Sequence, residues 1–366
     1  MPVSRPSLSS IRRRLLAWFN RHCRVLPWRR DRDPYRIWVS EVMLQQTTVA
    51  AVIPKYEQFL IAFPTLANLA RADEQDVLRH WQGLGYYRRA RHLHAATRLL
   101  LAEHAGQLPD DATIWAALPG VGRYILGAVL SQAFDRRLPI IEANSLRVLC
   151  RLYGQTGDPN SPAVRRWLWE AAEELLPQKR VGDFNQALME LGALVCTPTA
   201  PQCGECPLRN LCHAYCQGQQ GTIPLRTRPA AVTEVREVAV VVRNGGRVLL
   251  VRRPDHTRWP SLWEFPHGEV GLNETDAAAA LARLRDLTGI VATLGDEVLV
   301  VRHTITRFRI TLRAFAAKYR SGAFRSSFYV ESRWVKPAEL AGYPTSSPQQ
   351  KLAQAITAGP RQRRLS

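Results

Sequence analysis

The sequence has no hydrophobic run near the ~20 consecutive apolar residues that a membrane-spanning helix needs. The N-terminal segment 11–30 mixes Arg with apolar residues at helical spacing, and it lacks the apolar core of a secretion signal. We therefore expect a soluble, intracellular protein that has no membrane partner.

Acidic residues and Lys are both scarce. The chain has 31 Asp and Glu against 50 Lys and Arg, nearly all of them Arg, which leaves a net charge of +19. A balance this basic favours a polyanion, above all nucleic acid, as the partner. The alternative is a compositional preference for Arg without a binding role. The 366 residues suffice for about two or three domains, each with its own core.

Cysteine is also sparse, but four of the seven cysteines gather within residues 196–212 in the spacing C-x6-C-x2-C-x5-C: Cys196, Cys203, Cys206 and Cys212. Four thiolates this close in sequence can converge on one soft metal centre, either zinc or an iron–sulfur cluster. An intracellular setting disfavours disulfides. Spacing alone does not separate zinc from iron. The remaining cysteines are expected to be buried small residues or free thiols: Cys23, Cys150 and Cys216.

The composition and the apolar periodicity of the sequence change near residue 217. From Ile11 to Leu211 apolar residues recur at helical spacing, as in 77–102, 124–133 and 162–176. Residues 217–235 are polar with Gly and Pro, which predicts a linker. Beyond it, β-branched runs at 238–242 and 248–251 flank Asn-Gly-Gly, a hairpin signal. A helix is expected at 275–287 and further strands at 297–303, 309–319 and 328–335.

Two glycine-rich segments lie between predicted helices. In the segment 118–122, Gly120 and Gly122 allow backbone N–H groups to approach one anion, and the helix that follows adds its positive end. In a basic protein a DNA phosphate is a natural ligand, although an ordinary turn is equally compatible with the pattern. In the segment 83–87, Tyr86 precedes clustered Arg residues, which suits base stacking or, alternatively, core packing.

These segments, together with Ser-Glu-Val-Met-Leu-Gln-Gln-Thr at 40–47 and the four cysteines, occur in the order seen in the helix-hairpin-helix DNA glycosylases. Leu-Pro-Trp at 26–28 and the added C-terminal domain resemble the MutY-type adenine DNA glycosylases, which act on adenine opposite 8-oxoguanine. The resemblance covers about residues 11–350. It implies a [4Fe–4S] cluster on Cys196, Cys203, Cys206 and Cys212, and double-stranded DNA as the partner.

The resemblance implies a multidomain fold. An all-α helix-hairpin-helix glycosylase domain with an iron–sulfur loop is expected at 8–216, a linker at 217–235, and an α+β NUDIX-like lesion-recognition domain at 236–358. A NUDIX box normally holds Mg²⁺ through carboxylates. Here Gly268 and Glu274 keep its opening, but downstream acids are replaced by Ala282-Arg283 and Asp286-Leu287. We therefore expect no pyrophosphatase activity.

Cleavage of an N-glycosidic bond calls for an acid at the base and a carboxylate near the sugar. Glu41 matches the family's general acid, which protonates adenine N7. The second carboxylate falls at Glu142, where the family has Asp-Gly-Asn and this chain has Glu142-Ala143-Asn144. Glu keeps the charge but adds a methylene, and Ala removes the freedom of Gly. The substitution leaves three possibilities: an active enzyme, a slow enzyme, or a non-catalytic binder of damaged DNA.

Tyr124 occupies the place where bifunctional relatives resembling endonuclease III carry a Schiff-base Lys. A monofunctional glycosylase is therefore favoured over a bifunctional pyrimidine glycosylase-lyase, and Tyr124 and Asn144 are expected to orient the carboxylates. By the same resemblance Trp28, Arg29 and Gln186 line the adenine pocket, although core packing is an equal reading for Trp28. Gln46 and Tyr86 wedge into the base stack when adenine is flipped out.

In the C-terminal domain, the family's Phe-Ser-His loop that touches 8-oxoguanine aligns with residues 303–308. Thr306 keeps a hydroxyl there, and Arg307 can donate to a base edge or a phosphate. The expected function is removal of adenine paired with 8-oxoguanine or guanine, with a non-catalytic lesion binder as the alternative. We expect a monomer in the cytoplasm of a bacterium, associated with the nucleoid.

Overall fold

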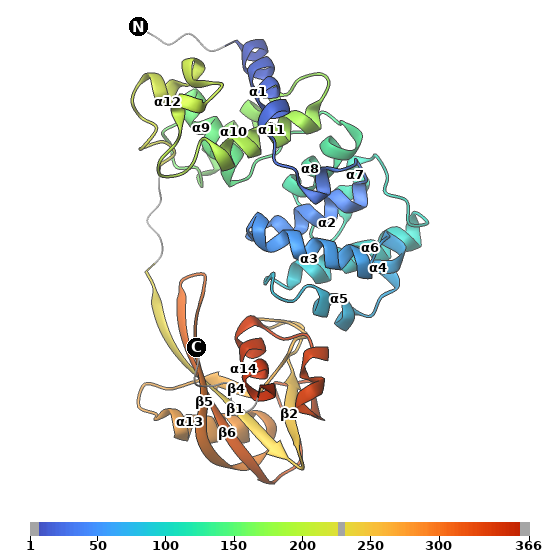
Figure 1. The fold of residues 1–366 in the computed structure, drawn as a ribbon, viewed down its shortest axis with the longest axis vertical. Coiled ribbons are helices and arrows are strands. Elements are labelled where there is room, and N and C mark those ends of the chain that lie inside the picture. The colour runs from blue at the N-terminus through green and yellow to red at the C-terminus, as the bar shows by residue number, and fades with distance from the viewer. Residues whose placement is uncertain (1–6, 226–230, 359–366) are drawn as a thin grey trace. The chain divides into compact units, whose positions relative to one another are not determined.

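The computed structural model describes residues 7–225 and 231–358 (Figure 1). Residues 226–230, within the expected linker, lie outside the described residues. By its internal packing the chain divides into two compact units, Met1–Ala70 with Ala95–Arg228, and Arg71–His94 with Pro229–Ser366. In the described part of the chain, no helix combines the length and the apolar character needed to cross a membrane.

The described helices up to residue 225 follow the apolar periodicity of the sequence. Those outside the segment 71–94 are α1 (Leu8–His22), η1 (Pro27–Arg29), α2 (Pro34–Leu44), α3 (Val49–Ala62), α4 (Leu66–Arg71), α7 (Ala112–Ala117), α8 (Arg123–Phe134), α9 (Ala143–Tyr153), α10 (Pro162–Leu175), α11 (Val181–Leu194), η2 (Cys203–Glu205), η3 (Arg209–Leu211) and α12 (His213–Cys216). Two more, α5 (Glu74–His80) and α6 (Arg88–Glu103), replace the single helix expected over 77–102. Left-handed glycines at Gly83 and Gly85 end the first before the second begins.

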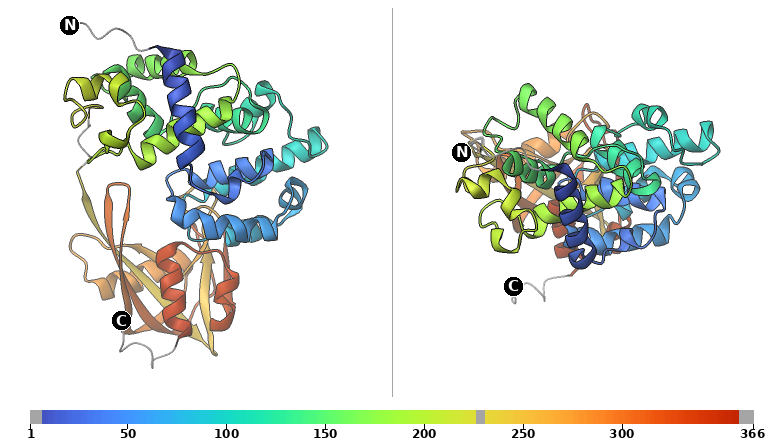
Figure 2. Two further views of the ribbon diagram at one scale, coloured as in Figure 1. Left: turned by 45° about the horizontal axis from the view of Figure 1, so that its top comes forward. Right: turned by 90° about the horizontal axis from the view of Figure 1, so that it is seen from above.

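One core of the first unit is built by α1, α9, α10 and α11, and it extends to the cysteine loop. Apolar side chains of these helices are buried together, and Cys196, Cys206 and Cys212 pack against them. Figure 2 shows α1 and α11 side by side. Close approach of α11 depends on two glycines, because a Cβ at Gly182 would lie 2.4 Å from the Ser131 carbonyl oxygen and one at Gly192 2.6 Å from Asn144 Cβ. The two glycines therefore allow α11 to pack closely against α8 and the start of α9.

The second unit is built on a seven-stranded mixed sheet in the order β3-β2-β1-β6-β5, with β4 paired to β1 and β7 to β2. Its strands and helices are β1 (Thr233–Asn244), β2 (Arg247–Arg252), β3 (Trp263–Glu264), β4 (His267–Glu269), α13 (Asp276–Thr288), β5 (Val291–Ile305), β6 (Phe308–Ser321), β7 (Glu331–Val335), η4 (Pro337–Gly342) and α14 (Ser347–Thr357). Alternate residues of β1 pack with α13 on one face and with α14 on the other.

Several strand boundaries differ from the sequence expectation. β1 begins at Thr233, inside the expected linker, because 233–243 pairs in parallel with β6. β5 begins at Val291 and not at 297, since it pairs with β6 along most of its length. The strand expected at 328–335 is limited to β7, because the backbone N–H groups of Phe328 and Tyr329 turn onto the Ser326 hydroxyl.

The segment 71–94 groups with the sheet unit, although the sequence analysis assigns it to the helical domain. Within this unit the Tyr87 hydroxyl donates a hydrogen bond to the Thr345 carbonyl over 2.8 Å. The domain boundaries drawn from the sequence remain a prediction.

Candidate active site

The first unit contains a pocket of about 550 Å³, within the size range of small-molecule sites, roughly 300–1,000 Å³. Eight residues expected to act in catalysis or substrate binding line it: Trp28, Arg29, Glu41, Gln46, Tyr124, Glu142, Asn144 and Gln186. They come from η1, the end of α2, α8, the start of α9 and α11. Segments far apart in the sequence thus meet at one cavity.

Glu41 lies in α2, whose first turn is capped by Asp33 and begun by Pro34. It is only 3% exposed. Tyr124 Oη donates to its Oε2 at 2.5 Å and Gln132 Nε2 to its Oε1 at 2.8 Å. Burial raises the pKa of Glu41, and the negative charge of Glu142 adds to this, whereas both hydrogen bonds act in the opposite direction. The net effect is a pKa above the usual value of a glutamate.

Glu142 is the N-cap of α9. Its carboxylate accepts hydrogen bonds from the backbone N–H groups of Asn144 (2.8 Å) and Ser145 (2.7 Å) and from Asn144 Nδ2 (3.1 Å). The Ser145 hydroxyl closes a capping box by accepting from the Glu142 N–H. Burial raises the pKa of Glu142, and these donors oppose the shift. Ala143 begins the helix, so the family's Gly is not needed for this backbone.

Arg29 is held in the pocket wall by Glu190. The two guanidinium nitrogens of Arg29 donate to Glu190 at 3.2 and 3.0 Å, and Arg24 donates to the same carboxylate through Nε and Nη2 at 2.9 and 2.8 Å. Burial disfavours the charge on Glu190, but these hydrogen bonds outweigh it and lower the pKa of Glu190 to about 2.

The remaining pocket candidates differ in exposure. Trp28 is buried and packs edge-on against Tyr56, with ring centroids 5.4 Å apart, so it contributes both to the core and to the pocket wall. Gln46 is exposed, follows the end of α2 and has a left-handed φ of 56°, a sparsely populated conformation. Gln186 lines the pocket from α11.

Other predicted residues lie away from this pocket. Gly120, with φ 76°, and Gly122, the N-cap of α8, form the turn that leads into the Tyr124 helix. A Cβ at Gly122 would meet nothing within 4 Å, so this turn borders open space. In the second unit Tyr86 is 48% exposed with a left-handed φ of 46°. Thr306 and Arg307 form the exposed tip of the β5–β6 hairpin.

Sequence reasoning missed further residues that line the pocket: Arg24, Gln132, Met189 and Glu190. The available signal for Gln132 was a polar side chain within the apolar run of α8. For Glu190 it was its position one helical turn after Gln186. Both signals are weak, because a polar residue in an amphipathic helix usually faces solvent.

The four thiols of the cysteine loop lie close enough to influence each other's ionisation. Burial raises the pKa of Cys206 to about 12, and the charges of Cys196, Cys212 and Cys203 add to the shift. Among the residues that the structure describes, no group of three His, Cys, Asp or Glu is arranged to hold a single metal ion. Arg151 Nη1 contacts Cys196 Sγ at 3.3 Å. A soft, half-buried set of four sulfur donors beside a cation fits an anionic iron–sulfur cluster.

In the second unit the guanidinium of Arg283 pairs with Glu274, an acid of the NUDIX box. Arg283 Nη2 lies 2.8 Å from Glu274 Oε2, and its Nε donates to the Glu269 carbonyl. A Cβ at Gly268 would lie 3.1 Å from the Arg283 side chain. Arg283 thus stands where the resemblance expects an acid and pairs with Glu274, the carboxylate retained from the opening of the box. Trp263 and Phe265 are buried in the core of this unit.

Comparison with protein families defines the class. Residues 39–174 match the HhH-GPD superfamily of base excision DNA repair proteins, residues 196–212 the iron–sulfur binding domain of endonuclease III, and residues 237–355 the NUDIX domain. This is a helix-hairpin-helix base excision repair protein with an iron–sulfur loop and a C-terminal NUDIX domain. The expected fold class and the [4Fe–4S] cofactor are thereby confirmed.

Individual relatives narrow the class. The adenine DNA glycosylase of Rattus norvegicus is 34% identical over 94% of this chain and 77% of its own length. That of Buchnera aphidicola subsp. Schizaphis graminum is 35% identical over 69% and 73%. The solved structure of a thermostable thymine-DNA glycosylase aligns with 57% of this chain and 97% of its own, with 30% identity and a TM-score of 0.53. The chain belongs to the adenine DNA glycosylase family.

Proposed function

We propose that this protein is a monofunctional base-excision-repair glycosylase that hydrolyses the N-glycosidic bond of adenine paired with 8-oxoguanine or guanine in duplex DNA. The observation that carries the proposal is the sharing of one pocket by two carboxylates, the buried Glu41 and the half-buried Glu142, with different hydrogen-bond partners. Its membership of the adenine DNA glycosylase family supports the choice of base, and its DNA-binding relatives support the partner.

The hydrogen-bond partners divide the chemistry between the carboxylates. Glu142 receives two backbone N–H bonds and sits at the positive end of α9, and these partners favour its ionised form. Glu41 receives one of its two bonds from a tyrosine hydroxyl, which can equally accept. We therefore assign Glu41 as the acid that protonates adenine N7. Glu142 is the carboxylate that stabilises the developing sugar cation, and water completes the hydrolysis.

The pocket favours a monofunctional reaction. Tyr124 stands where a Schiff-base Lys is expected in bifunctional relatives, and no Lys lines the pocket among the described residues. Asn144 donates to Glu142 and is expected to steady it, while Trp28, Arg29 and Gln186 face the adenine. The [4Fe–4S] cluster on Cys196, Cys203, Cys206 and Cys212 has a structural role in this proposal.

The opposite base is read by the second unit. Thr306 and Arg307 form an exposed tip able to donate hydrogen bonds, and Gln46 and Tyr86, both exposed with left-handed backbones, act as wedges in the base stack. Because the tip differs from the family's Phe-Ser-His loop, discrimination between 8-oxoguanine and guanine is expected to be relaxed. The proposal includes a monomer acting at the nucleoid in a bacterial cytoplasm.

The test is single-turnover adenine release from an A·8-oxoguanine duplex, with A·G and A·C duplexes measured beside it. Release that is abolished in Glu41→Gln, with DNA affinity retained, supports the proposal. The absence of release by the wild type, with release gained in Glu142→Asp, supports the alternative of a non-catalytic lesion binder. A borohydride-trapped protein–DNA adduct would instead show a lyase.

A further inference from the structure

Gln132 lies in the apolar run of α8, and its side chain is 6% exposed. A buried amide is costly unless its polar atoms are paired, and an aliphatic residue would fill this position without that cost. The partner of Gln132 is Glu41, since its Nε2 donates to Glu41 Oε1 at 2.8 Å. The hydrogen bond of this buried amide is thus made to the assigned acid.

The position of this amide is fixed by packing. The neighbouring Ser131 hydroxyl accepts a hydrogen bond from Asn185 of α11 at 2.9 Å. Gly182 lets the backbone of α11 lie against the Ser131 carbonyl and the Cα of Gln132. α8 therefore has little freedom to rotate, and Gln132 is held toward the pocket while Ser131 serves the helix–helix contact.

The two oxygens of Glu41 have partners of different chemistry. An amide N–H can only donate, so Oε1 faces a group that accepts no proton from it. The Tyr124 hydroxyl at Oε2 can donate to the ionised carboxylate and, after rotation about its C–O bond, accept from the protonated acid. With the amide in place, the proton of Glu41 therefore resides on Oε2.

We propose that Gln132 is a positioning residue that anchors Glu41 through Oε1 and leaves Oε2 as the oxygen that carries the proton for adenine. The inference rests on the proposed function, because it assigns the proton-bearing atom of the same acid. It adds a residue that the family resemblance does not assign.

The groups that face Glu41 determine the pH dependence. Tyr124 and Gln132 come from α8, Glu142 from the start of α9, and Arg29 from η1, while Met189 of α11 contacts the Tyr124 hydroxyl at 3.6 Å. Burial and Glu142 raise the pKa of Glu41, whereas Tyr124, Gln132 and Arg29 lower it. Removing the Gln132 donor alone therefore raises this pKa further.

The experiment compares the wild type with Gln132→Leu and Gln132→Met, two apolar residues of similar size. Single-turnover adenine release is measured from about pH 5 to about pH 9, where a rate that depends on a protonated acid declines at high pH. Loss of one buried hydrogen bond should move that decline up by about one pH unit and lower the plateau rate by about tenfold. DNA affinity should stay unchanged.

Ser131→Ala is the matched control, because it removes the adjacent buried hydrogen bond, whereas the close backbone approach at Gly182 still holds α8 and the Gln132–Glu41 contact is kept. It should lower stability but leave the pH of the decline in place. A decline at the same pH in wild type, Gln132→Leu and Gln132→Met would overturn the proposal. So would a shift toward lower pH, since the amide would then be presenting its carbonyl to the protonated acid.

A second readout does not depend on turnover. The Glu41 carboxyl is titrated by 13C NMR in protein labelled at the glutamate side-chain carboxyls, with Glu41→Gln to assign the signal. A raised pKa in Gln132→Leu supports the proposal, and an unchanged one overturns it. If the wild type releases no adenine, the proposed function fails, and this titration still decides the role of Gln132.

Discussion

The carboxylate of Glu142 accepts the backbone N–H of Asn144 at 2.8 Å and so closes the N-terminus of α9 within the pocket. Glu142 thereby has two roles: it caps the helix, and it supplies a carboxylate to the pocket. Asp and Glu both place an oxygen near the first turn of a helix. The extra methylene of Glu142 is accommodated here by the capping box with Ser145.

Glu142→Gln separates these two roles, because it keeps a hydrogen-bond acceptor for the cap and removes the charge. Its amide oxygen can still accept from the first turn, so the free energy of unfolding should change by less than about 1 kcal/mol. The charge that stabilises the sugar cation is lost, and single-turnover excision should fall by about 100-fold or more. Urea unfolding and adenine release measure the two effects. Glu142→Asp, which keeps the charge and the cap, is the control. Near-normal excision by Glu142→Gln would refute the assignment.

A second prediction concerns Glu190, which pairs with Arg24 and Arg29. The pKa of Glu190 is lowered from 4.5 to about 2, so the pair contributes stability at pH values above 4.5 and loses it as the pH falls toward 2. The shift corresponds to about 3 kcal/mol. Glu190→Gln should lower the free energy of unfolding at neutral pH by about this amount, because two guanidinium groups lose their counter-charge.

The same variant should flatten the acid limb of the stability profile, which is measured by urea unfolding at a series of pH values. Glu170→Gln, a change of an exposed Glu on α10, is the matched control and should leave the profile unaltered. If Glu190→Gln and the wild type lost stability equally on acidification, the low pKa would not belong to Glu190.

Several residues of the pocket could be predicted from the sequence, whereas the contacts that hold them could not. Glu41, Tyr124 and Glu142 could be found because short motifs with a resemblance carry them, and helical periodicity placed them on separate helices. Gln132 and Glu190 could not, since their partners lie far away in the sequence and meet them only when the helices pack: Glu41 of α2 for Gln132, and Arg24 and Arg29 for Glu190. That packing depends on Gly182 and Gly192, whose lack of a side chain has no meaning until the neighbouring helix is known.

Strand ends were the least predictable part of the fold. The first half of β5 is largely exposed and carries Asp296 and Glu297, so it shows no long apolar alternation, and its pairing with β6 defines it as strand. Thr233–Val235 likewise resembles a linker in the sequence, since the residues it pairs with, 308–310, lie 75 positions later in the chain. Pairing over such distances is absent from a local pattern.

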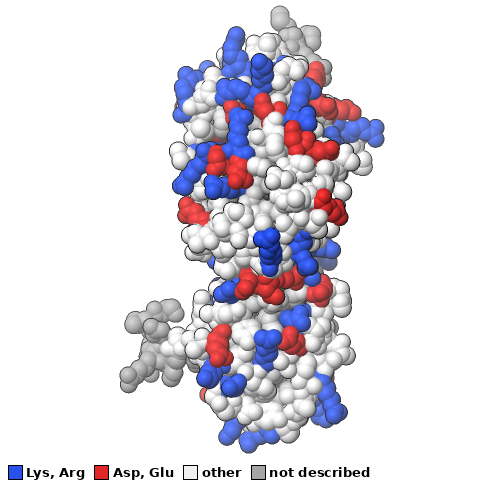
Figure 3. All heavy atoms as spheres, turned by 90° about the vertical axis from the view of Figure 1, so that its right-hand side faces the viewer, with Lys and Arg blue, Asp and Glu red and all other residues white. Residues whose placement is uncertain are grey.

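Binding to DNA should depend steeply on salt. The chain carries a net charge of +19, and the face in Figure 3 shows Lys and Arg spread over it with Asp and Glu between them. A protein that makes about six phosphate contacts loses about 10³-fold in affinity between roughly 50 and 200 mM salt. Fluorescence anisotropy with a labelled duplex measures this. An undamaged duplex should give a similar slope, because phosphate contacts carry no sequence information. A nearly flat dependence would refute the basic-surface argument.

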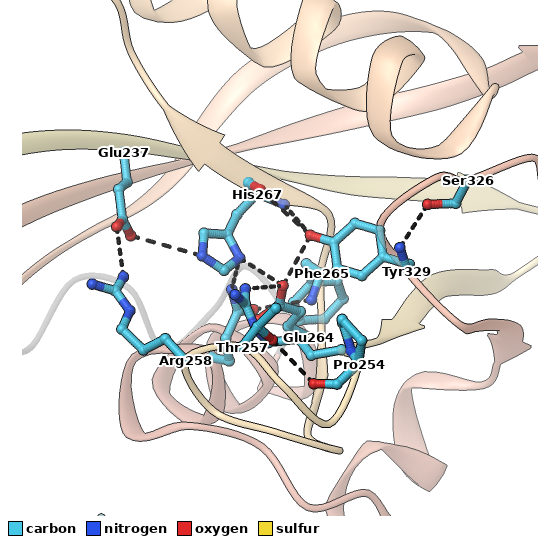
Figure 4. A network of polar contacts seen from close by, with 11 residues as sticks. Glu237, Pro254, Thr257, Arg258, Glu264, Phe265, His267, Ser326 and Tyr329 are labelled. Carbon is cyan, nitrogen blue, oxygen red and sulfur yellow. Dashed lines mark hydrogen bonds and ion pairs between the residues drawn. The ribbon is translucent and has the colours of Figure 1, made fainter.

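The last prediction concerns a buried network in the second unit (Figure 4). His267 lies between two carboxylates, with Nδ1 at 3.1 Å from Glu264 Oε1 and Nε2 at 3.8 Å from Glu237 Oε2. Arg253 and Arg258 pair with the same carboxylates at 2.9 and 2.8 Å. Burial alone would lower the pKa of His267, but Glu264 and Glu237 outweigh it and raise the pKa above 6.5.

Because the folded-state pKa of His267 is raised, its stabilisation is fully present below pH 6.5 and is lost as the pH rises through the higher value. The pKa of Glu264 is lowered, because its charged partners outweigh burial, so its contribution holds above pH 4.5 and fades on further acidification. The sheet unit should therefore be most stable between these limits. His267→Gln should remove the decline on the alkaline side and destabilise the unit by about 3 kcal/mol at pH 6.5.

Amide hydrogen exchange of β3 and β4 reports the opening of this unit separately from the helical one, which overall unfolding does not. The comparison is made at several pH values after correction for the intrinsic exchange rate. His256→Gln, a change of an exposed His in the same unit, should leave the profile intact. An alkaline decline that persists in His267→Gln would mean that another group titrates, and the imidazolium between Glu264 and Glu237 would not be the source of the stability.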